Sequence, residues 1–113
     1  MKRWLLTLLS LPLAATAAVP LQCDVGPVTK VFGSTSWLVY SCSDHTSVVV
    51  LSAPGSPASS FYFILSLEGA NYKLRGEGTG SKAETNAALK QLQALSKSDV
   101  EALVRETRAV RKP

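Results

Sequence analysis

The sequence has few of the residues from which enzymes and metal sites are built. Its 113 residues include one histidine, His45, and two cysteines, Cys23 and Cys42. A Ser-His-Asp hydrolase would need His45 as its general base, but His45 lies between Asp44 and Thr46 in a predicted polar turn. The carboxylates fall on separate turns and strand ends, without the pairing of a general acid and a nucleophile. We therefore predict no catalytic residues, no metal site, no cofactor and no enzymatic activity.

The chain also lacks an apolar run long enough to span a membrane, which takes about 20 residues. Its apolar stretch near the N-terminus is shorter and is interrupted by Pro12. Lys2 and Arg3 precede this stretch, and Ala15-Thr16-Ala17 ends it with small residues at the positions that signal peptidase reads. Residues 1–17 are therefore predicted to be a cleaved secretory signal peptide rather than a membrane anchor.

Removal of this segment leaves residues 18–113, which suffice for a single small domain with one core. Without Lys2 and Arg3, ten Lys and Arg stand against eight Asp and Glu, so the formal net charge falls from +4 to +2. A nucleic-acid-binding domain needs a clustered basic surface. We therefore predict no nucleic-acid partner, no membrane span after cleavage, and a periplasmic or secreted location.

Both cysteines remain after cleavage. In an oxidising compartment an even number predicts a disulfide, here Cys23–Cys42, which closes a loop of about 20 residues. The alternative use of Cys23 is a lipid anchor, but a lipid-modified cysteine is the first residue after cleavage and follows a small residue. Gln22 precedes Cys23, so the sequence indicates release rather than tethering.

Strand patterns occupy the first half of the mature chain. Val48–Leu51 is continuously apolar, which predicts a central strand covered on both faces. Residues alternate between apolar and charged over Tyr72–Glu77, which is typical of an edge strand with one solvent-exposed face. A loop rich in Pro, Gly and Ser is expected over residues 53–60. The five predicted strands are Val28–Phe32, Trp37–Cys42, Val48–Leu51, Phe61–Leu67 and Tyr72–Glu77.

Helix signals occupy the second half. Ser81-x-x-Glu84 and Ser98-x-x-Glu101 have the form of capping boxes, and they predict helices over residues 82–95 and 99–110. Arg105 and Arg108, near the end of the second helix, are either solvated cations favoured by the helix dipole or contacts to an anionic envelope surface. Strands followed by helices predict an α+β fold, with an antiparallel sheet of about five strands and a C-terminal pair of helices packed on one face.

The candidate ligand-binding residues are Gly76, Gly78, Gly80, Ser81 and Lys82, at a predicted strand-to-helix junction. Backbone amides at the start of a helix can bind an anion. The spacing departs from a phosphate-binding loop, in which a glycine stands directly before the lysine. The alternative interpretation is a flexible connection that Ser81 caps.

Six aromatic residues lie at strand spacing and have two interpretations. They form core and cross-strand pairs, or part of them forms an exposed face for a partner. The sequence leaves both interpretations open for Trp37, Tyr40, Phe61, Tyr62, Phe63 and Tyr72.

Five short segments, spread over most of the mature chain, resemble a group of small exported proteins of Gram-negative bacteria with no assigned function. They are Tyr40-Ser-Cys-Ser-Asp44, Ser52-Ala-Pro-Gly55, Phe61-Tyr-Phe63, Gly76-Glu-Gly-Thr-Gly80 and Leu95-Ser-Lys-Ser-Asp99. Tyr40-x-Cys42 before a strand is also similar to small periplasmic lysozyme inhibitors, which share a signal, a disulfide and a short β-rich body. The segment containing Ser and Gly that those inhibitors insert into lysozyme is not recognisable.

Together these patterns predict a non-enzymatic periplasmic or secreted domain that binds a protein or an envelope component. The alternative hypothesis is a small-ligand or anion-binding module that uses residues 76–82.

Overall fold

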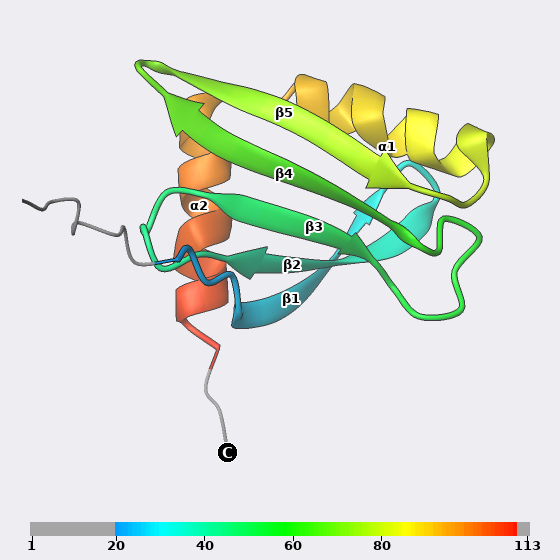
Figure 1. Cartoon of the computed structure of the whole chain (residues 1–113), viewed down its shortest axis with the longest axis horizontal. Helices are drawn as coiled ribbons and strands as arrows, with labels where there is room; N and C mark the ends of the chain where they lie inside the picture. Colours follow the sequence, from blue (N-terminus) through cyan, green and yellow to red (C-terminus); the bar gives the residue numbers. More distant parts are fainter. Residues whose placement is uncertain (1–19, 111–113) are drawn as a thin grey trace, which may run out of the picture.

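The computed structural model describes residues 20–110, so the predicted signal peptide, residues 1–17, lies outside them. Five antiparallel strands form one sheet in the order β1-β2-β3-β4-β5, and two helices follow. Both helices lie on the same face of the sheet, behind it in Figure 1. The predicted α+β fold is confirmed. The elements are β1 (Val25–Phe32), β2 (Thr35–Ser41), β3 (Val48–Ser52), β4 (Phe61–Glu68), β5 (Asn71–Gly78), α1 (Lys82–Gln93) and α2 (Lys97–Arg108).

β1 is longer than predicted, because it starts at Val25 rather than Val28. Its register with β2 shifts between these two residues, where the sequence holds Gly26-Pro27. A bulge at this point lets an edge strand continue through a proline that cannot donate to the ladder. β2 is also longer at its start, since Thr35 and Ser36 pair with β1.

The core lies between the helices and one face of the sheet. Side chains of a strand alternate between its two faces, and on β2 Trp37 and Val39 are fully buried on the helix side. The indole N–H of Trp37 donates to the carbonyl of Phe32 over 3.1 Å, which satisfies its one polar atom. The other buried hydrophobic residues include Val48, Val50, Phe63, Leu65, Ala88, Leu92, Val100, Leu103 and Val104.

The prediction that β3 is covered on both faces is wrong. Val48 and Val50 are buried, but Val49 is half-buried and Leu51 is exposed. β3 is central in the sheet, yet the two helices cover only the other face. A continuous apolar run therefore reflects one buried face and one open apolar face.

The capping predictions need correction at both helices. α2 begins at Lys97, because Ser96 and Asp99 form the capping box in place of Ser98 and Glu101. Ser81 is the N-cap residue of α1, but its side chain makes no capping hydrogen bond. Glu84 instead accepts a hydrogen bond from the hydroxyl of Ser34 over 2.8 Å, and so links α1 to the β1–β2 turn.

The helices end slightly earlier than predicted, at Gln93 and Arg108. Within residues 20–110, neither helix combines the length and apolar character that a membrane crossing requires.

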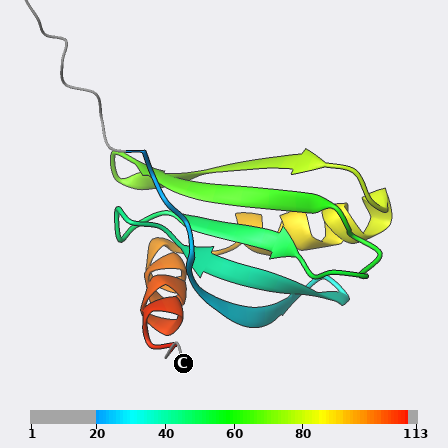
Figure 2. The ribbon, with the colours of Figure 1, turned by 60° about the horizontal axis from the view of Figure 1, so that its bottom comes forward.

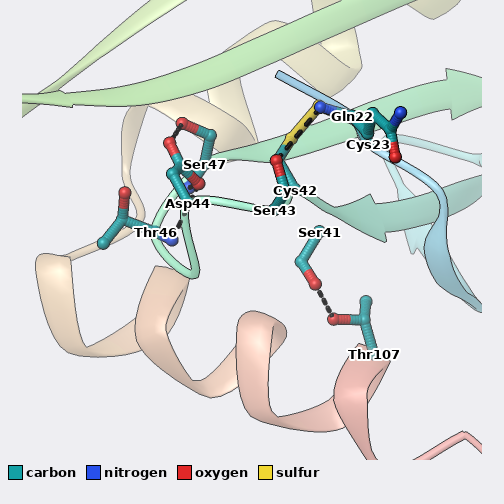
Figure 3. The surroundings of a disulfide bond; sticks show 9 residues. All are labelled: Gln22, Cys23, Ser41, Cys42, Ser43, Asp44, Thr46, Ser47 and Thr107. Atoms are coloured by element: carbon teal, nitrogen blue, oxygen red, sulfur yellow. Dashed lines mark hydrogen bonds between the residues drawn. A yellow bond between two sulfur atoms is a disulfide. The ribbon is translucent and has the colours of Figure 1, made fainter. Parts of the chain in front are cut away.

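α2 is fastened to the sheet by polar contacts as well as by apolar packing. Thr107 and Ser41 are both fully buried, and their hydroxyl oxygens lie 2.6 Å apart in a hydrogen bond (Figure 3). Lys30 on β1 points to the helix side and forms a 2.6 Å ion pair with Glu106. α1 packs instead against the end of the β1–β2 hairpin, as Figure 2 shows from a second direction.

A disulfide closes the open end of the β1–β2 hairpin (Figure 3). It joins Cys23, just before β1, to Cys42, just after β2, and Cys42 is fully buried. The predicted pairing is confirmed. The residue before Cys23 is held as well, because the Ser43 N–H donates to the Gln22 carbonyl over 2.6 Å.

Asp44 orders the turn between β2 and β3. Its carboxylate accepts hydrogen bonds from the Thr46 N–H (3.0 Å), the Ser47 N–H (2.8 Å) and the Ser47 hydroxyl (2.6 Å). Partial burial acts to raise the pKa of Asp44, but the bonds from Ser47 and Thr46 together outweigh it and lower that pKa.

Loss of the disulfide is expected to destabilise the fold. In the chain-entropy model, closing a loop of this length contributes about 3 kcal/mol. The Cys23→Ala/Cys42→Ala double variant should therefore lose about 3 kcal/mol of unfolding free energy in urea titrations. The unreduced, denatured wild-type protein should offer no reactive thiol, and labelling of either cysteine would contradict the pairing.

The Asp44 turn predicts a pH-dependent stability. Asp44→Ala should lower the unfolding free energy by about 1 kcal/mol at pH 7, through loss of hydrogen bonds to a charged acceptor. Since the pKa of Asp44 is lower in the folded state, its contribution is full above the unfolded-state pKa of about 4 and fades as the pH falls through the folded-state pKa. Urea titrations should show that the difference in unfolding free energy between wild type and Asp44→Ala becomes smaller from pH 7 to pH 3. A difference that grows over this range would contradict the role of Asp44.

Candidate functional site

The face of the sheet opposite the helices carries a group of apolar side chains that no described element covers. Figure 1 looks onto this face, with both helices behind the sheet. Leu51 and Tyr62 keep 38% and 40% of their surface exposed, and the other members are half-buried. We call this group the open-face patch, and it consists of Leu38, Tyr40, Val49, Leu51, Tyr62 and Ile64.

The strand register makes the open-face patch continuous. One row runs across three strands, because Leu38 pairs with Leu51 and Leu51 pairs with Tyr62. In the same way, Tyr40 pairs with Val49 and Val49 with Ile64. Directly opposed side chains on one face stand about 5 Å apart. The two rows therefore form one apolar surface over β2, β3 and β4.

A charged rim on β5 borders the open-face patch. Ile64 pairs with Arg75, Ser66 with Lys73 and Tyr62 with Glu77. The Tyr62 hydroxyl donates to the Glu77 carboxylate over 3.3 Å. An apolar centre bordered by charged and polar side chains is the usual composition of a protein-binding surface.

The structure resolves the question left open for the aromatic residues. Tyr40 and Tyr62 belong to the open-face patch, whereas the other four point to the helix side. Trp37 and Phe63 pack with ring centroids 5.4 Å apart, and Phe61 and Phe63 at 4.9 Å. Tyr72 is half-buried and donates its hydroxyl hydrogen to the Thr46 carbonyl over 2.9 Å.

The glycines of the candidate ligand-binding segment lie against neighbouring backbone. Gly78 faces the carbonyl of Ser60, and Gly80 faces that of Ala58, both so closely that a Cβ atom would collide. Their φ angles, +138° and +107°, are also ones that other residues rarely adopt. The two glycines therefore have a packing role between β5 and the loop before β4.

Ser81 and Lys82 begin α1 beside these glycines, and both are exposed. Gly76 lies on β5 over the rings of Phe61 and Phe63. The part of the chain that the structure describes holds no pocket around this segment or elsewhere. Anion binding by residues 76–82 stays a prediction.

The remaining candidate residues are separate from the open-face patch. His45 is exposed in the β2–β3 turn, with a φ of 65°. Arg105 and Arg108 are exposed in the last turn of α2, on the helix side of the sheet. Over residues 20–110 no three His, Cys, Asp or Glu side chains come together as ligands for a metal ion.

Sequence reasoning missed the open-face patch as a unit. A signal was present, because apolar residues occupy both alternating sets of positions in β2, β3 and β4. Two short helices cannot cover both faces of a five-stranded sheet, so one of the two sets had to stay uncovered. Which set stays open depends on tertiary packing rather than on local pattern.

No protein family model, curated protein or solved structure matches the chain. The two resemblances noted for the sequence therefore stay predictions, and the site is argued on its own geometry.

Gly78→Ala should destabilise the protein by about 2 kcal/mol or more, because the new methyl group meets the Ser60 carbonyl at a φ that alanine avoids. Gly55→Ala is the matched control, since its φ of +80° is also unfavourable but no atom lies near the added methyl group. Thermal unfolding should show the larger loss for Gly78→Ala. Equal losses would contradict the packing role of Gly78.

Proposed function

We propose that this protein is an exported, non-enzymatic binding domain that holds a partner protein on the open-face patch. The proposal is based on the contiguous apolar surface of β2, β3 and β4, which no element of the described part of the chain covers. Monomeric proteins rarely expose large contiguous apolar surfaces, and those that do use them for partners. Tyr62 and Tyr40 add aromatic side chains with polar tips, a type enriched at the centre of protein interfaces.

Export is supported by the cysteine chemistry. Disulfides persist in oxidising compartments and are rare in the cytosol, and Cys23–Cys42 closes the hairpin on which β3 is built. The predicted signal peptide, residues 1–17, points to the same compartments. On this proposal the protein works in the periplasm or outside the cell.

The small net charge favours a protein, rather than an anionic envelope surface, as the binding partner. Without Lys2 and Arg3 of the predicted signal peptide, ten basic residues stand against eight acidic ones, a formal net charge of only +2. Adsorption to an anionic lipid surface relies on an excess of Lys and Arg near the membrane. The rim of the open-face patch holds both signs, Lys73 and Arg75 with Glu77, which suits a polar protein rim.

Leu51→Glu tests the proposal. It places a charge at the centre of the open-face patch, which a bound partner would have to desolvate, so we expect partner affinity to fall about tenfold or more. Val110→Glu is the matched control, because Val110 is 36% exposed and lies just beyond α2, away from the patch. Both variants should keep the far-ultraviolet circular dichroism spectrum of the wild type.

The measurement is capture from an envelope extract of the producing organism on immobilised wild type and variants. We expect one protein to be retained by wild type and Val110→Glu and to be lost from Leu51→Glu. Failure to retain any protein, or equal retention by all three, would overturn the proposal. Retention of anionic lipid vesicles in place of a protein would favour the envelope component instead.

A further inference from the structure

We propose that two copies of the chain pair through the outer edges of β5, so that their sheets join into one continuous antiparallel sheet. This goes beyond the proposed function, because it uses the edge of the sheet and a second copy rather than the open-face patch. The proposal rests on the contrast between the two edges, on the backbone groups of β5 that point away from β4, and on the charged side chains that pairing would oppose.

The two edges of the sheet differ in how they are protected from pairing. β1 carries a bulge at Gly26-Pro27 and an inward-pointing Lys30 that pairs with Glu106. Bulges, proline and inward-pointing charges are among the devices by which edge strands resist pairing. β5 has none of these three, and its charged side chains, Lys73, Arg75 and Glu77, are of both signs. Its eight residues pair with β4 without a register shift, and β5 is the last strand of the sheet.

The backbone groups of β5 that point away from β4 can be assigned. The Thr79 N–H donates to the Ser60 carbonyl over 2.7 Å, so residues 60 and 79 form a hydrogen-bonded pair. Such pairs recur at every second residue in an antiparallel ladder. Lys73, Arg75 and Glu77 therefore bond to β4. The outward N–H and C=O groups belong to Tyr72, Leu74, Gly76 and Gly78.

Charge selects the register of the second copy. A two-fold axis at Leu74 would oppose Lys73 to Arg75 of the second copy. An axis at Arg75 would oppose Lys73 to Glu77 on either side, but it would also oppose the two Arg75 residues at its centre. Like charges in directly opposed positions destabilise a strand pair. An axis at Gly76 opposes Arg75 to Glu77 of the second copy twice by symmetry, and it opposes no like charges within β5.

The same register brings the outward backbone groups of the two copies into hydrogen-bonding positions. Gly76 faces Gly76, and Leu74 faces Gly78 on either side, as the hydrogen-bonded pairs of the new ladder. Arg75 and Glu77 then form the pairs between them, in which opposed side chains stand closest.

Apolar contacts on the helix side agree with this register. Gly78 pairs with Phe61 on β4 and has no side chain of its own. Leu74 of the second copy, opposite Gly78, can therefore reach the ring of Phe61. Leu74 and Phe61 are both half-buried at the border of the core. Pairing of the edges would extend each core into the other across two glycines.

Charge reversal with rescue tests the proposal. Arg75→Glu and Glu77→Arg each place like charges in opposition, so each should raise the dimer dissociation constant of the purified disulfide-bonded protein about tenfold or more. In a mixed dimer of the two variants, one copy carries acidic side chains at positions 75 and 77 and the other carries basic ones, so both opposed pairs again join opposite charges. An equimolar mixture should therefore dimerise as tightly as the wild type. Sedimentation velocity over a concentration series measures all four samples.

Lys73→Glu is the matched control, because an axis at Gly76 places Lys73 opposite Thr79 rather than opposite a charge. It changes the net charge as Arg75→Glu does and should leave the dissociation constant within about twofold of the wild type. A wild type that stays monomeric at millimolar concentration, or a mixture that fails to dimerise, would overturn the proposal. Loss of the dimer in Leu51→Glu but not in Arg75→Glu would also overturn it, by placing the second copy on the open-face patch.

Discussion

The covering of only one face of the sheet is the constraint on which the rest of the structure depends. Five strands spaced about 4.8 Å apart make a sheet about 20 Å across. A helix with its side chains is about 10 Å wide, so α1 and α2 together cover about one face. The apolar side chains on the other face of β2, β3 and β4 are then covered by no helix or strand of residues 20–110. The open-face patch follows from this shortage of covering elements.

The contacts between α2 and strands β1 and β2 determine which face of the sheet the helices cover. Thr107 on α2 and Ser41 on β2 are both fully buried and bond to one another, so this hydrogen bond joins α2 to the buried face of the sheet. Lys30 and Glu106 add an ion pair at the edge strand β1. The disulfide holds the opposite end of the same hairpin. These contacts all involve β1 and β2, at one side of the sheet, whereas β4 pairs with β3 and β5, and β5 pairs with β4.

Local patterns predicted the elements well, because strand alternation and turn residues act over a few neighbours. Local patterns gave wrong predictions where two alternative local structures fit the same residues. Ser96 and Ser98 both precede a helical pattern, and the capping box forms at Ser96 with Asp99, so the helix begins two residues earlier than predicted. Val48–Leu51 is apolar at every position, which local pattern alone cannot separate into a buried and an open set. The disulfide was predictable because only one intramolecular pairing exists.

The candidate site was harder to predict than the fold, since exposure depends on where the helices pack. The glycine-rich segment drew attention as a binding loop, but Gly78 and Gly80 lie against the backbone of Ser60 and Ala58. Tyr62, part of an aromatic cluster in the sequence, lies on the open face while its neighbours Phe61 and Phe63 face the core. Function on this account belongs to a surface rather than to a pocket.

The most direct test of the central claim is whether solvent reaches one face of the sheet and not the other. Methyl-resolved NMR spectra with a neutral, soluble gadolinium chelate report this contact through signal broadening. The account predicts strong broadening for the methyl groups of Val49, Leu51 and Ile64 and little for those of Val48, Val50 and Leu65. Equal protection of the two sets would contradict it, because the open face would then be covered.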